Sequence, residues 1–258
     1  MYNIDLRGRH ALVMGVANHR SLAWAIAQEL HKAGARLCLT YAGERLKKDV
    51  DELAGTLSNA FTLECDVTKD YQIDEVAKKL ESRWGSLEIL VHGIAFARRE
   101  DLEGSFVSTP REGFQLALDV SAYSFINVVN RHLHLLAKNG ASVITLTYLA
   151  SQRAVPNYNV MASAKAVLEQ SVRQMAFELG SQNVRVNALS AGPVSTLAAR
   201  GIRGFSEMLK EHGHMAPLRR NITKEEVGTA GLFLLSDMAS GVTGTTLYVD
   251  SGYHIMGW

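Results

Sequence analysis

The 258-residue chain has only two cysteines and four prolines, and its 27 Lys and Arg residues nearly balance its 26 Asp and Glu residues. So little cysteine excludes a small domain held by disulfides, and Cys38 and Cys65 are expected to be reduced core residues because both lie in apolar stretches. A net charge of +1 does not suggest a nucleic-acid or membrane-surface protein. No apolar run approaches the ~20 residues of a membrane span, and no signal peptide is evident. We therefore expect a cytoplasmic protein that binds neither nucleic acid nor membrane.

The chain also lacks the G-x-G-x-x-G fingerprint of dinucleotide-binding folds, because Gly15 is the only glycine between the first predicted strand and Gly34. The order of elements is nevertheless typical of such folds. A buried strand, an amphipathic helix and a second strand are predicted at His10–Met14, Ser21–Lys32 and Arg36–Tyr41. Ser21 is the predicted N-cap of the helix. A strand–turn–helix unit of this kind offers backbone N–H groups and a positive helix end to a pyrophosphate.

Apolar runs typical of strands alternate with helical patterns along the whole chain. The further predicted strands are Phe61–Cys65, Leu87–Val91, Ala141–Leu146, Val184–Leu189 and Thr245–Val249. The further predicted helices include Arg45–Leu57, Ile73–Trp84, Arg111–Ala137, Asn157–Leu179 and Lys224–Leu235. No linker or repeat divides the chain, so residues 1–258 are expected to form a single α/β domain. The alternation predicts a doubly wound Rossmann-type fold, with seven parallel strands, helices on both faces, and ligands beyond the carboxyl ends of the strands.

Two phenols and an amine follow the predicted strand Ala141–Leu146. They are Tyr148, Tyr158 and Lys165, spaced Tyr-x9-Tyr-x6-Lys. A phenol can donate a hydrogen bond to a carbonyl oxygen that gains negative charge, and an ammonium can hold a polyhydroxyl or anionic cofactor. The alternative is that the tyrosines are packing residues and the lysine is solvated. The spacing alone leaves both interpretations open, and the nucleotide-binding pattern at the start of the chain favours the chemical one.

Several motifs identify a family. The chain resembles, nearly end to end, the enoyl-acyl-carrier-protein reductases of bacterial fatty-acid synthesis, a divergent branch of the short-chain dehydrogenase/reductase superfamily. The most specific motifs are GVAN-x2-S, which replaces the Gly-rich turn, and Tyr-x9-Tyr-x6-Lys. Ordinary superfamily members carry Tyr-x3-Lys, but Met161 stands four residues before Lys165. Other matching segments are LTYAGERL, CDVT, HGIAFA, REGFQLALDVSAYSF, VRVNALSAGPVSTLAARGI, APLRRNITKEEVG and TLYVDSGYHI.

The resemblance implies reduction of a trans-2-enoyl thioester on acyl carrier protein by a homotetrameric, NADH-dependent enzyme. It implies that Tyr158 and Lys165 are catalytic, together with Tyr148, which either positions the substrate or forms part of the pocket wall. The cofactor would contact Gly15, Ser21, Leu22, Ala42, Asp66, Val67, Ile94, Lys165, Val194, Ser195, Thr196, Leu197 and Ala198. The acyl substrate would contact Ala97, Tyr148, Tyr158, Met161, Ile202 and Phe205. No metal is expected, because the pairs His132/His134 and His212/His214 have a spacing that separates them on a helix.

Some alternatives and departures remain. A dienoyl-thioester reductase, a ketoreductase and a non-enzymatic nucleotide sensor share this fold, although Met161 argues against a ketoreductase. The chain has Ala150 and Ala162 where the family commonly has glycine, which bears on chain-length preference and inhibitor affinity. NADH is favoured over NADPH because Ala42 and Gly43 carry no charge and Glu44 would repel a 2′-phosphate, with Arg45 as the counter-argument.

Two further expectations concern the C-terminal third of the chain. An apolar strip of Tyr253, Ile255, Met256 and Trp258 is expected to be exposed on a monomer, which favours the tetramer. A lid over the substrate is expected at about 195–212, within which Thr196–Lys210 has a helical pattern interrupted by Gly201 and Gly204. Since glycine in a helix costs about 1 kcal/mol relative to alanine, we expect this segment to become ordered with ligand.

Overall fold

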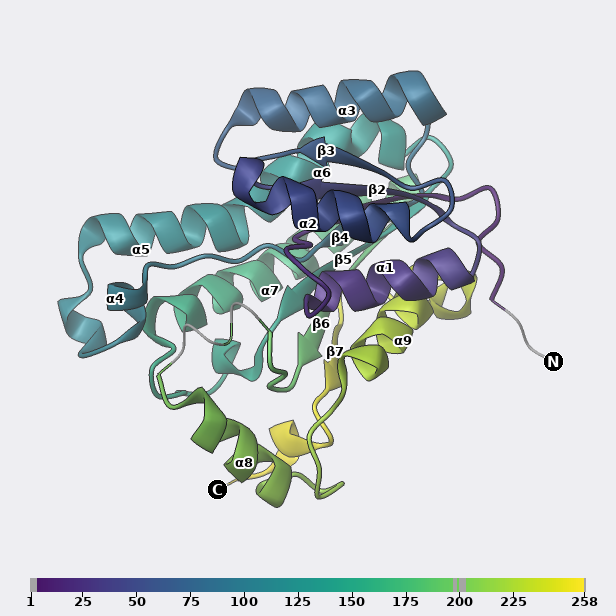
Figure 1. Cartoon of the computed structure of the whole chain (residues 1–258). Helices are drawn as coiled ribbons and strands as arrows, with labels where there is room; N and C mark the ends of the chain where they lie inside the picture. Colours follow the sequence, from purple (N-terminus) through teal and green to yellow (C-terminus); the bar gives the residue numbers. More distant parts are fainter. Residues whose placement is uncertain (1–3, 197–198, 200–202, 258) are drawn as a thin grey trace.

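The computed structural model describes residues 4–196, 199 and 203–257, and it confirms the predicted parallel sheet (Figure 1). Seven strands lie in the order β3-β2-β1-β4-β5-β6-β7, and every neighbouring pair is parallel. The strands are β1 His10–Met14, β2 Arg36–Tyr41, β3 Phe61–Glu64, β4 Ile89–His92, β5 Ala141–Thr147, β6 Val184–Ala191 and β7 Thr246–Val249. Each begins and ends within two residues of the bounds expected from the apolar runs.

Helices cover both faces of the sheet, as a doubly wound fold requires. On one face pack α1 (Leu22–Lys32), α2 (Glu44–Gly55) and α9 (Lys224–Leu235), whose apolar side chains form one core cluster with that side of the strands. On the other face α3 (Asp70–Trp84), α6 (Ser124–Leu136) and α7 (Asn159–Leu179) form a second cluster. Cys38 and Cys65 are buried free thiols in the second cluster, as expected.

The remaining helices extend beyond the sheet. They are α4 (Arg99–Leu102) and α5 (Arg111–Leu118), on the left in Figure 1, and α8 (Phe205–Met215), beside the C-terminal tail in the lower part. Short 3₁₀ turns occur at Phe106–Ser108, Leu149–Ser151, Gly180–Gln182, Asp237–Ala239 and Tyr253–Ile255. Gly204, one of the two glycines expected to interrupt the helical pattern of Thr196–Lys210, has a left-handed φ of 75°, and α8 begins at the next residue.

At two places the structure differs in detail from the prediction. The continuous helix Arg111–Ala137 is divided, because a π-helical turn at Asp119–Tyr123 separates α5 from α6. A π turn has hydrogen bonds that span one residue more than those of an α-helix, and side-chain periodicity alone does not reveal it. Ser21 occupies the N-cap position of α1, but its side chain makes no capping hydrogen bond. Its Oγ instead accepts hydrogen bonds from the amides of Ala17 and Asn18 in the preceding turn.

The sheet has its switch point between β1 and β4, where the chain reverses the direction in which it adds strands. The turns that follow these two strands touch. Gly15 has φ +91°, and a Cβ built there would lie 2.1 Å from the carbonyl oxygen of Gly93. Only glycine tolerates both that φ and that approach. Ligands of such sheets bind in the crevice beyond this point.

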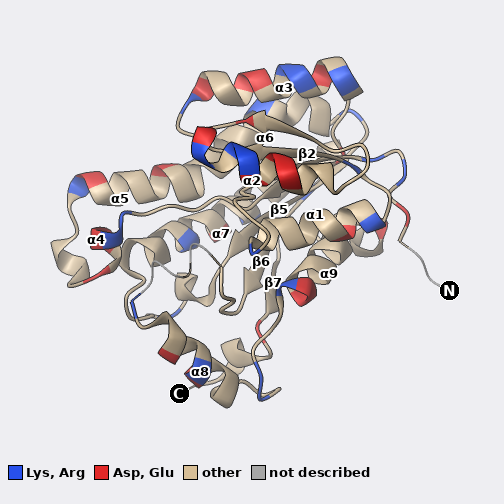
Figure 2. Ribbon diagram, viewed as in Figure 1, with Lys and Arg blue, Asp and Glu red and all other residues tan. Residues whose placement is uncertain are grey.

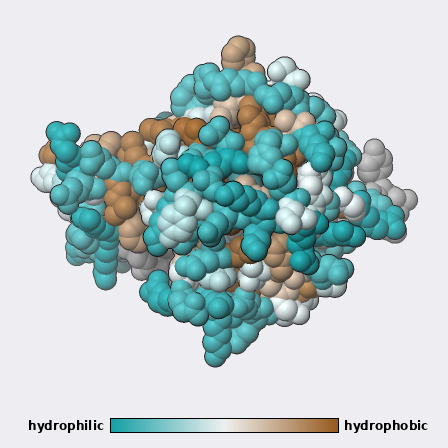
Figure 3. Space-filling view, turned by 90° about the horizontal axis from the view of Figure 1, so that it is seen from above, coloured by the Kyte–Doolittle hydropathy of each residue, from teal (hydrophilic) through white to brown (hydrophobic). Residues whose placement is uncertain are grey.

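The surface has no face of a single charge in the view of Figure 2, where basic and acidic residues are interspersed on α2 and α3. From above, hydrophilic residues cover most of the molecule and hydrophobic ones gather in smaller patches (Figure 3). Over the described residues, none of the helices combines the length and the apolar character that crossing a bilayer requires.

Candidate active site

Two adjoining cavities occupy the carboxyl ends of the strands. The first, of about 640 Å³, lies beyond β1, β2, β3 and β4. The second, of about 410 Å³, lies between α7, α8 and the segments that follow β4, β5 and β6. They share the lining residues Leu22, Ala95, Phe96, Leu146 and Thr196. Because they share a wall, the two cavities form one cleft that can hold two ligands in contact.

The first cavity fits a dinucleotide. The turn after β1 is held by the Ser21 hydroxyl, which accepts hydrogen bonds from the amides of Ala17 and Asn18 at 3.0 Å and 3.2 Å. Because this hydroxyl is used on the turn, the first amides of α1 and the positive end of its dipole stay available to an anionic group. Gly15 and Gly93, whose backbones are in close contact, both line this cavity, so part of its wall is bare backbone.

The far end of the first cavity carries an acid. Asp66 lines it, and its carboxylate accepts the Thr68 amide and hydroxyl at 3.1 Å and 2.7 Å and lies 3.3 Å from the Lys69 ammonium. Burial alone would raise the pKa of Asp66, but these hydrogen bonds and Lys69 outweigh it and lower the pKa. The carboxylate is therefore ionised at neutral pH and can accept a hydrogen bond from the amino group of a nucleotide base.

The second cavity contains the two phenols. Tyr148 and Tyr158 lie edge to face with ring centroids 5.1 Å apart, and the Tyr148 hydroxyl lies 3.7 Å from the sulfur of Met208. Burial raises the pKa of Tyr158, with Tyr148 as a smaller cause, and burial raises the pKa of Tyr148 to about 12. Both phenols are therefore protonated at neutral pH, and each can donate a hydrogen bond.

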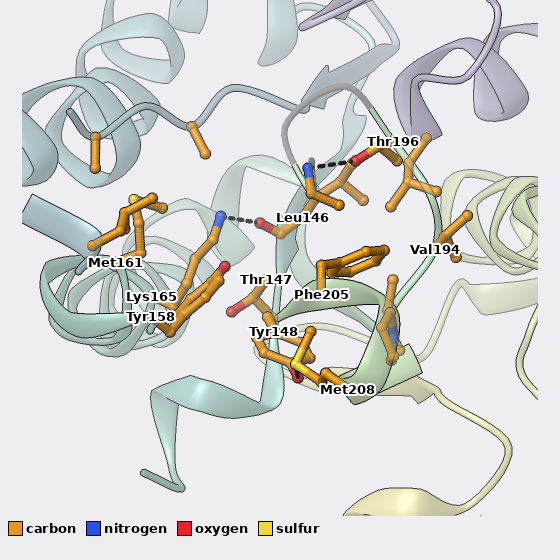
Figure 4. A pocket seen from close by; sticks show the side chains of 18 of the residues that line it. Leu146, Thr147, Tyr148, Tyr158, Met161, Lys165, Val194, Thr196, Phe205 and Met208 are labelled. Carbon is orange, nitrogen blue, oxygen red and sulfur yellow. Dashed lines mark hydrogen bonds between the residues drawn. The ribbon is translucent and has the colours of Figure 1, made fainter. Parts of the chain in front are cut away.

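Lys165 lies at the junction of β5 and the second cavity. Its side chain is buried, and Nζ donates a hydrogen bond of 2.7 Å to the carbonyl oxygen of Leu146 (Figure 4). Burial lowers its pKa to about 8, and Glu169 partly opposes the shift. An ammonium has three donors. With one on Leu146, the others can serve hydroxyl groups of a ligand in the cleft.

The structure brings together most of the site residues expected from the sequence. The first cavity is lined by Gly15, Ser21, Leu22, Ala42, Asp66, Val67, Ile94 and Thr196. The second is lined by Ala97, Tyr148, Tyr158, Met161, Lys165, Val194 and Phe205. Ser195 is exposed and lines neither cavity. Leu197, Ala198 and Ile202 lie outside the described residues.

Several lining residues were not predicted. Met208 faces the second cavity from α8, opposite Lys165 on α7 and Tyr158 at the N-cap of that helix, as Figure 4 shows. It lies three residues after Phe205 on the same helix face, so helical periodicity was sufficient to find it. Leu102 enters from the short helix α4, for which no sequence pattern was recognised. Phe96 lines both cavities, next to the predicted Ala97.

Comparison with known proteins gives a consistent result. A family model described as enoyl-(acyl carrier protein) reductase matches residues 15–254. An enoyl-acyl-carrier-protein reductase (NADH), FabI, of Bacillus subtilis is 50% identical over 255 residues, 98% of each chain. The Nostoc enzyme of the same name is 50% identical over 257 residues, 98% of this chain and 99% of its own.

Solved structures agree with these relatives. The Bacillus cereus enoyl-acyl-carrier-protein reductase, solved with NADP⁺ and an indole naphthyridinone, superimposes with a TM-score of 0.96 at 49% identity over the whole of both chains. The Anaplasma phagocytophilum enzyme, solved with NAD, has a TM-score of 0.95 at 43% identity, covering 100% of this chain and 98% of its own.

Replacing Lys165 tests its buried charge independently of chemistry. A base whose folded pKa is lowered from 10.5 to about 8 destabilises the fold at neutral pH, where it is charged in both states. Between pH 8 and 10.5 the unfolded chain binds more protons, so stability rises with pH. We expect Lys165→Met to remove this rise, on the order of 3 kcal/mol at most. The measurement is chemical denaturation of ligand-free protein across this range. Lys78→Met, at an exposed position, is the control, and equal pH dependence of Lys165→Met and wild type would contradict the prediction.

Proposed function

Because the chain belongs to the enoyl-acyl-carrier-protein reductase family, we propose that its two cavities hold NADH and a trans-2-enoyl thioester against each other. The activity is that of an NADH-dependent enoyl-acyl-carrier-protein reductase of bacterial type II fatty-acid synthesis. The observation that supports this assignment of the cavities is their shared wall, with Lys165 and Tyr158 opening onto the second cavity. A hydride donor in one cavity and its acceptor in the other would then be neighbours.

Tyr158 is proposed to stabilise the charge that develops in the reaction. NADH supplies the hydride, which adds to C3 of the enoyl group. Negative charge then collects on the thioester oxygen as an enolate, and C2 is protonated afterwards. The Tyr158 phenol, protonated because its pKa is raised, donates a hydrogen bond to that oxygen. Such a donor acts where water is excluded and its orientation is set in advance, which strengthens its effect on the transition state.

Lys165 and Tyr148 are proposed to position the reactants. The Lys165 ammonium is fixed on the Leu146 carbonyl, and its remaining donors would hold the ribose hydroxyls beside the nicotinamide. Tyr148 packs edge to face on Tyr158 and limits its ring orientations. The rest of the second cavity is mostly apolar, with Ala97, Met161 and Phe205 among its walls. Apolar walls fit an acyl chain and keep water from the reacting carbons.

NADH rather than NADPH fits the end of the first cavity. Ala42 and Gly43 line it after β2 and carry no charge. Arg45 also lines it but is exposed, so its guanidinium is solvated. Lys69, the other cation there, is paired with Asp66. A 2′-phosphate would therefore find no buried, unpaired cation among the described residues of this cavity.

The function is tested by mixing the protein with NADH and crotonyl thioester and following the absorbance of the reduced nicotinamide. Oxidation of NADH that requires the enoyl thioester supports a reductase, and its absence would favour a nucleotide sensor. Parallel reactions with a ketoacyl thioester and a dienoyl thioester separate the two alternative reductases. An arm with NADPH, expected to give a lower kcat/KM, tests the cofactor preference.

A homotetramer is proposed, but on different grounds from those expected. The tail does not present a continuous apolar strip, because Tyr253 is half-buried and stacks on His212 with ring centroids 4.2 Å apart. Ile255 is exposed, Met256 is half-buried, and Trp258 lies outside the described residues. Exposed apolar side chains instead occur at Tyr123 in the π turn, at Ile126 on α6, and at Val167 and Phe177 on α7. Exposed apolar groups on neighbouring helices suit contact with a second copy.

The carrier protein and the compartment are also proposals. The enoyl substrate is carried on an acyl carrier protein, which would approach the open side of the second cavity near α8. Arg203 is exposed just before α8 and is available to an acidic partner, while Arg200 lies outside the described residues. A cytoplasmic location agrees with two free, buried thiols.

A lid within residues 195–212 is proposed as part of the single catalytic domain. α8 brings Phe205 and Met208 to the second cavity, and its next turn is fixed by the stack of His212 on Tyr253. The N-terminal turn of α8 follows left-handed Gly204 and is held by the contact of the Met208 sulfur with the Tyr148 hydroxyl and by the hydrogen bond from Asn157 Nδ2 to the Arg203 carbonyl. An acyl chain touching Phe205 and Met208 would add contacts to this end of α8.

Tyr158→Phe is expected to lower kcat by about 100-fold or more, because one oxyanion donor is worth on the order of 3 kcal/mol. NADH affinity should be nearly unchanged. Tyr148→Phe is the matched control, since its phenol lies beside Tyr158 and contacts the Met208 sulfur, and we expect a much smaller loss. Steady-state kinetics with crotonyl thioester measures both. A Tyr158→Phe enzyme with near wild-type kcat would remove Tyr158 from the mechanism.

Sedimentation at micromolar concentration is expected to show a tetramer. Phe177→Asp should shift the distribution to smaller species, because Phe177 is 83% exposed on α7 and a buried carboxylate would oppose association. Val107→Asp, at a site 90% exposed outside α6 and α7, should leave the assembly unchanged. A wild-type protein that sediments only as a monomer refutes the proposal.

Hydrogen exchange tests the lid. Amides of Thr196–Lys210 are expected to exchange rapidly in the ligand-free enzyme and to slow when cofactor and an acyl-pocket ligand are both bound, because bound ligand adds contacts that the helix end lacks. The buried strand Ala141–Thr147 is the internal control and should be protected in both states. Equal protection of these amides with and without ligands would contradict the proposed lid.

A further inference from the structure

One buried hydroxyl holds the segment that separates the two cavities. Ser121, in the π-helical turn between α5 and α6, is 0% exposed. Its Oγ accepts a hydrogen bond from the amide of Phe96 at 3.0 Å and donates one to the carbonyl oxygen of Phe96 at 3.1 Å. The sulfur of Met161 lies 3.6 Å from the same oxygen. A hydroxyl has a single proton, so the stronger acceptor, the Phe96 carbonyl, takes it and the sulfur contact is packing.

Phe96 belongs to the partition between the cavities. Ala95 and Phe96 line both, Ile94 lines the first and Ala97 the second. Residues 94–97 have no regular secondary structure. Within the described part of the chain, the two bonds to Ser121 are the hydrogen bonds that join this segment to another one. The position of the partition therefore depends on Ser121.

The π turn explains how a helix can supply this contact. Val120, Ser121 and Ala122 are consecutive and all buried, which a regular helix packed on one side does not allow. Val120 lines the first cavity, while Ser121 reaches the Phe96 segment. The wider turn thus directs two neighbouring side chains inward, Val120 to the wall of the first cavity and Ser121 to the Phe96 backbone. Such turns inside helices occur frequently at functional sites.

We propose that Ser121 is a positioning residue for the reduction: by fixing the Phe96 backbone it sets the distance between the nicotinamide and the enoyl group. The inference rests on the proposed function of the two cavities. Ser121 touches neither ligand in this arrangement. It acts through the partition, whose displacement would separate hydride donor and acceptor without removing any group that contacts them. A misplacement of about 1 Å can cost on the order of 100-fold in rate.

Ser121→Ala removes the hydroxyl and leaves the size of the site nearly unchanged. We expect kcat, expressed per NADH-binding site, to fall by at least about tenfold, with the Kd of NADH changed by less than about threefold, because most cofactor contacts lie elsewhere in the first cavity. Ser121→Thr retains a hydroxyl and should recover part of the lost kcat. Counting only NADH-binding sites removes any loss that arises from unfolded protein.

Ser142→Ala is the matched control. Ser142 is also buried, and its hydroxyl donates to the carbonyl of Leu234 at 2.8 Å, on β5 and away from both cavities. It should lower stability but leave kcat unchanged. If Ser121→Ala does not yield folded protein, Ser121→Cys takes its place with the same expected loss, since a thiol donates weakly.

The outcomes are separable. Wild-type protein without enoyl-thioester reduction defeats the proposed function. Active wild type with an unchanged kcat in Ser121→Ala overturns the role of Ser121 alone. A loss of kcat in Ser142→Ala equal to that in Ser121→Ala would also overturn it, because any buried serine would then have the same effect.

Discussion

The burial of the Lys165 ammonium is the constraint on which the arrangement of the site depends. A charged amine inside a protein must be hydrogen-bonded, and Lys165 meets this need with the carbonyl oxygen of Leu146, just before β5 ends. This bond ties α7 to the carboxyl end of β5, which fixes where the other residues on that face of α7 can lie. The lowered pKa of Lys165 shows that the arrangement is costly without a ligand. A site that stabilises its ligands at the expense of the free protein is the usual relation between stability and activity.

The register of α7 follows from that anchor. Met161 and Lys165 are four residues apart and share one face of α7, Tyr158 is the N-cap residue just before the helix, and all three line the second cavity. Met161 occupies the position where the wider superfamily has its tyrosine. The phenol is instead supplied by Tyr158, the N-cap residue of α7, three residues earlier in the chain. A donor displaced toward the N-terminal end of α7 suits an oxygen three bonds from the carbon that accepts the hydride, as in an enoyl thioester. The spacing Tyr-x6-Lys thus has a geometric consequence for the reaction.

Prediction from the sequence succeeded where periodicity and burial coincide. β1 and α9 were located to the residue, since each is a run of one period bounded by turn or capping residues. It failed where a contact distant in sequence decides the local structure. The π turn at Asp119–Tyr123 exists together with the bond from Ser121 to Phe96, 25 residues away, and nothing near Ser121 in the sequence indicates that partner. Leu102 likewise entered the site through a helix of one turn, too short to give a periodic signal.

The C-terminal tail shows the same limit and adds a second support for the site. Its apolar residues suggested an exposed surface, yet Tyr253 packs on His212 of α8. Asp250 accepts hydrogen bonds from the amides of Gly252 and His254, which folds the tail back on itself. After burial, Tyr253 and then Asp250 are the groups that raise the pKa of Tyr148, so the tail lies close to the reacting phenols. A movement of α8 toward or away from the cavity has to displace the tail or break the His212–Tyr253 stack. The end of the chain thus limits how far α8 can open.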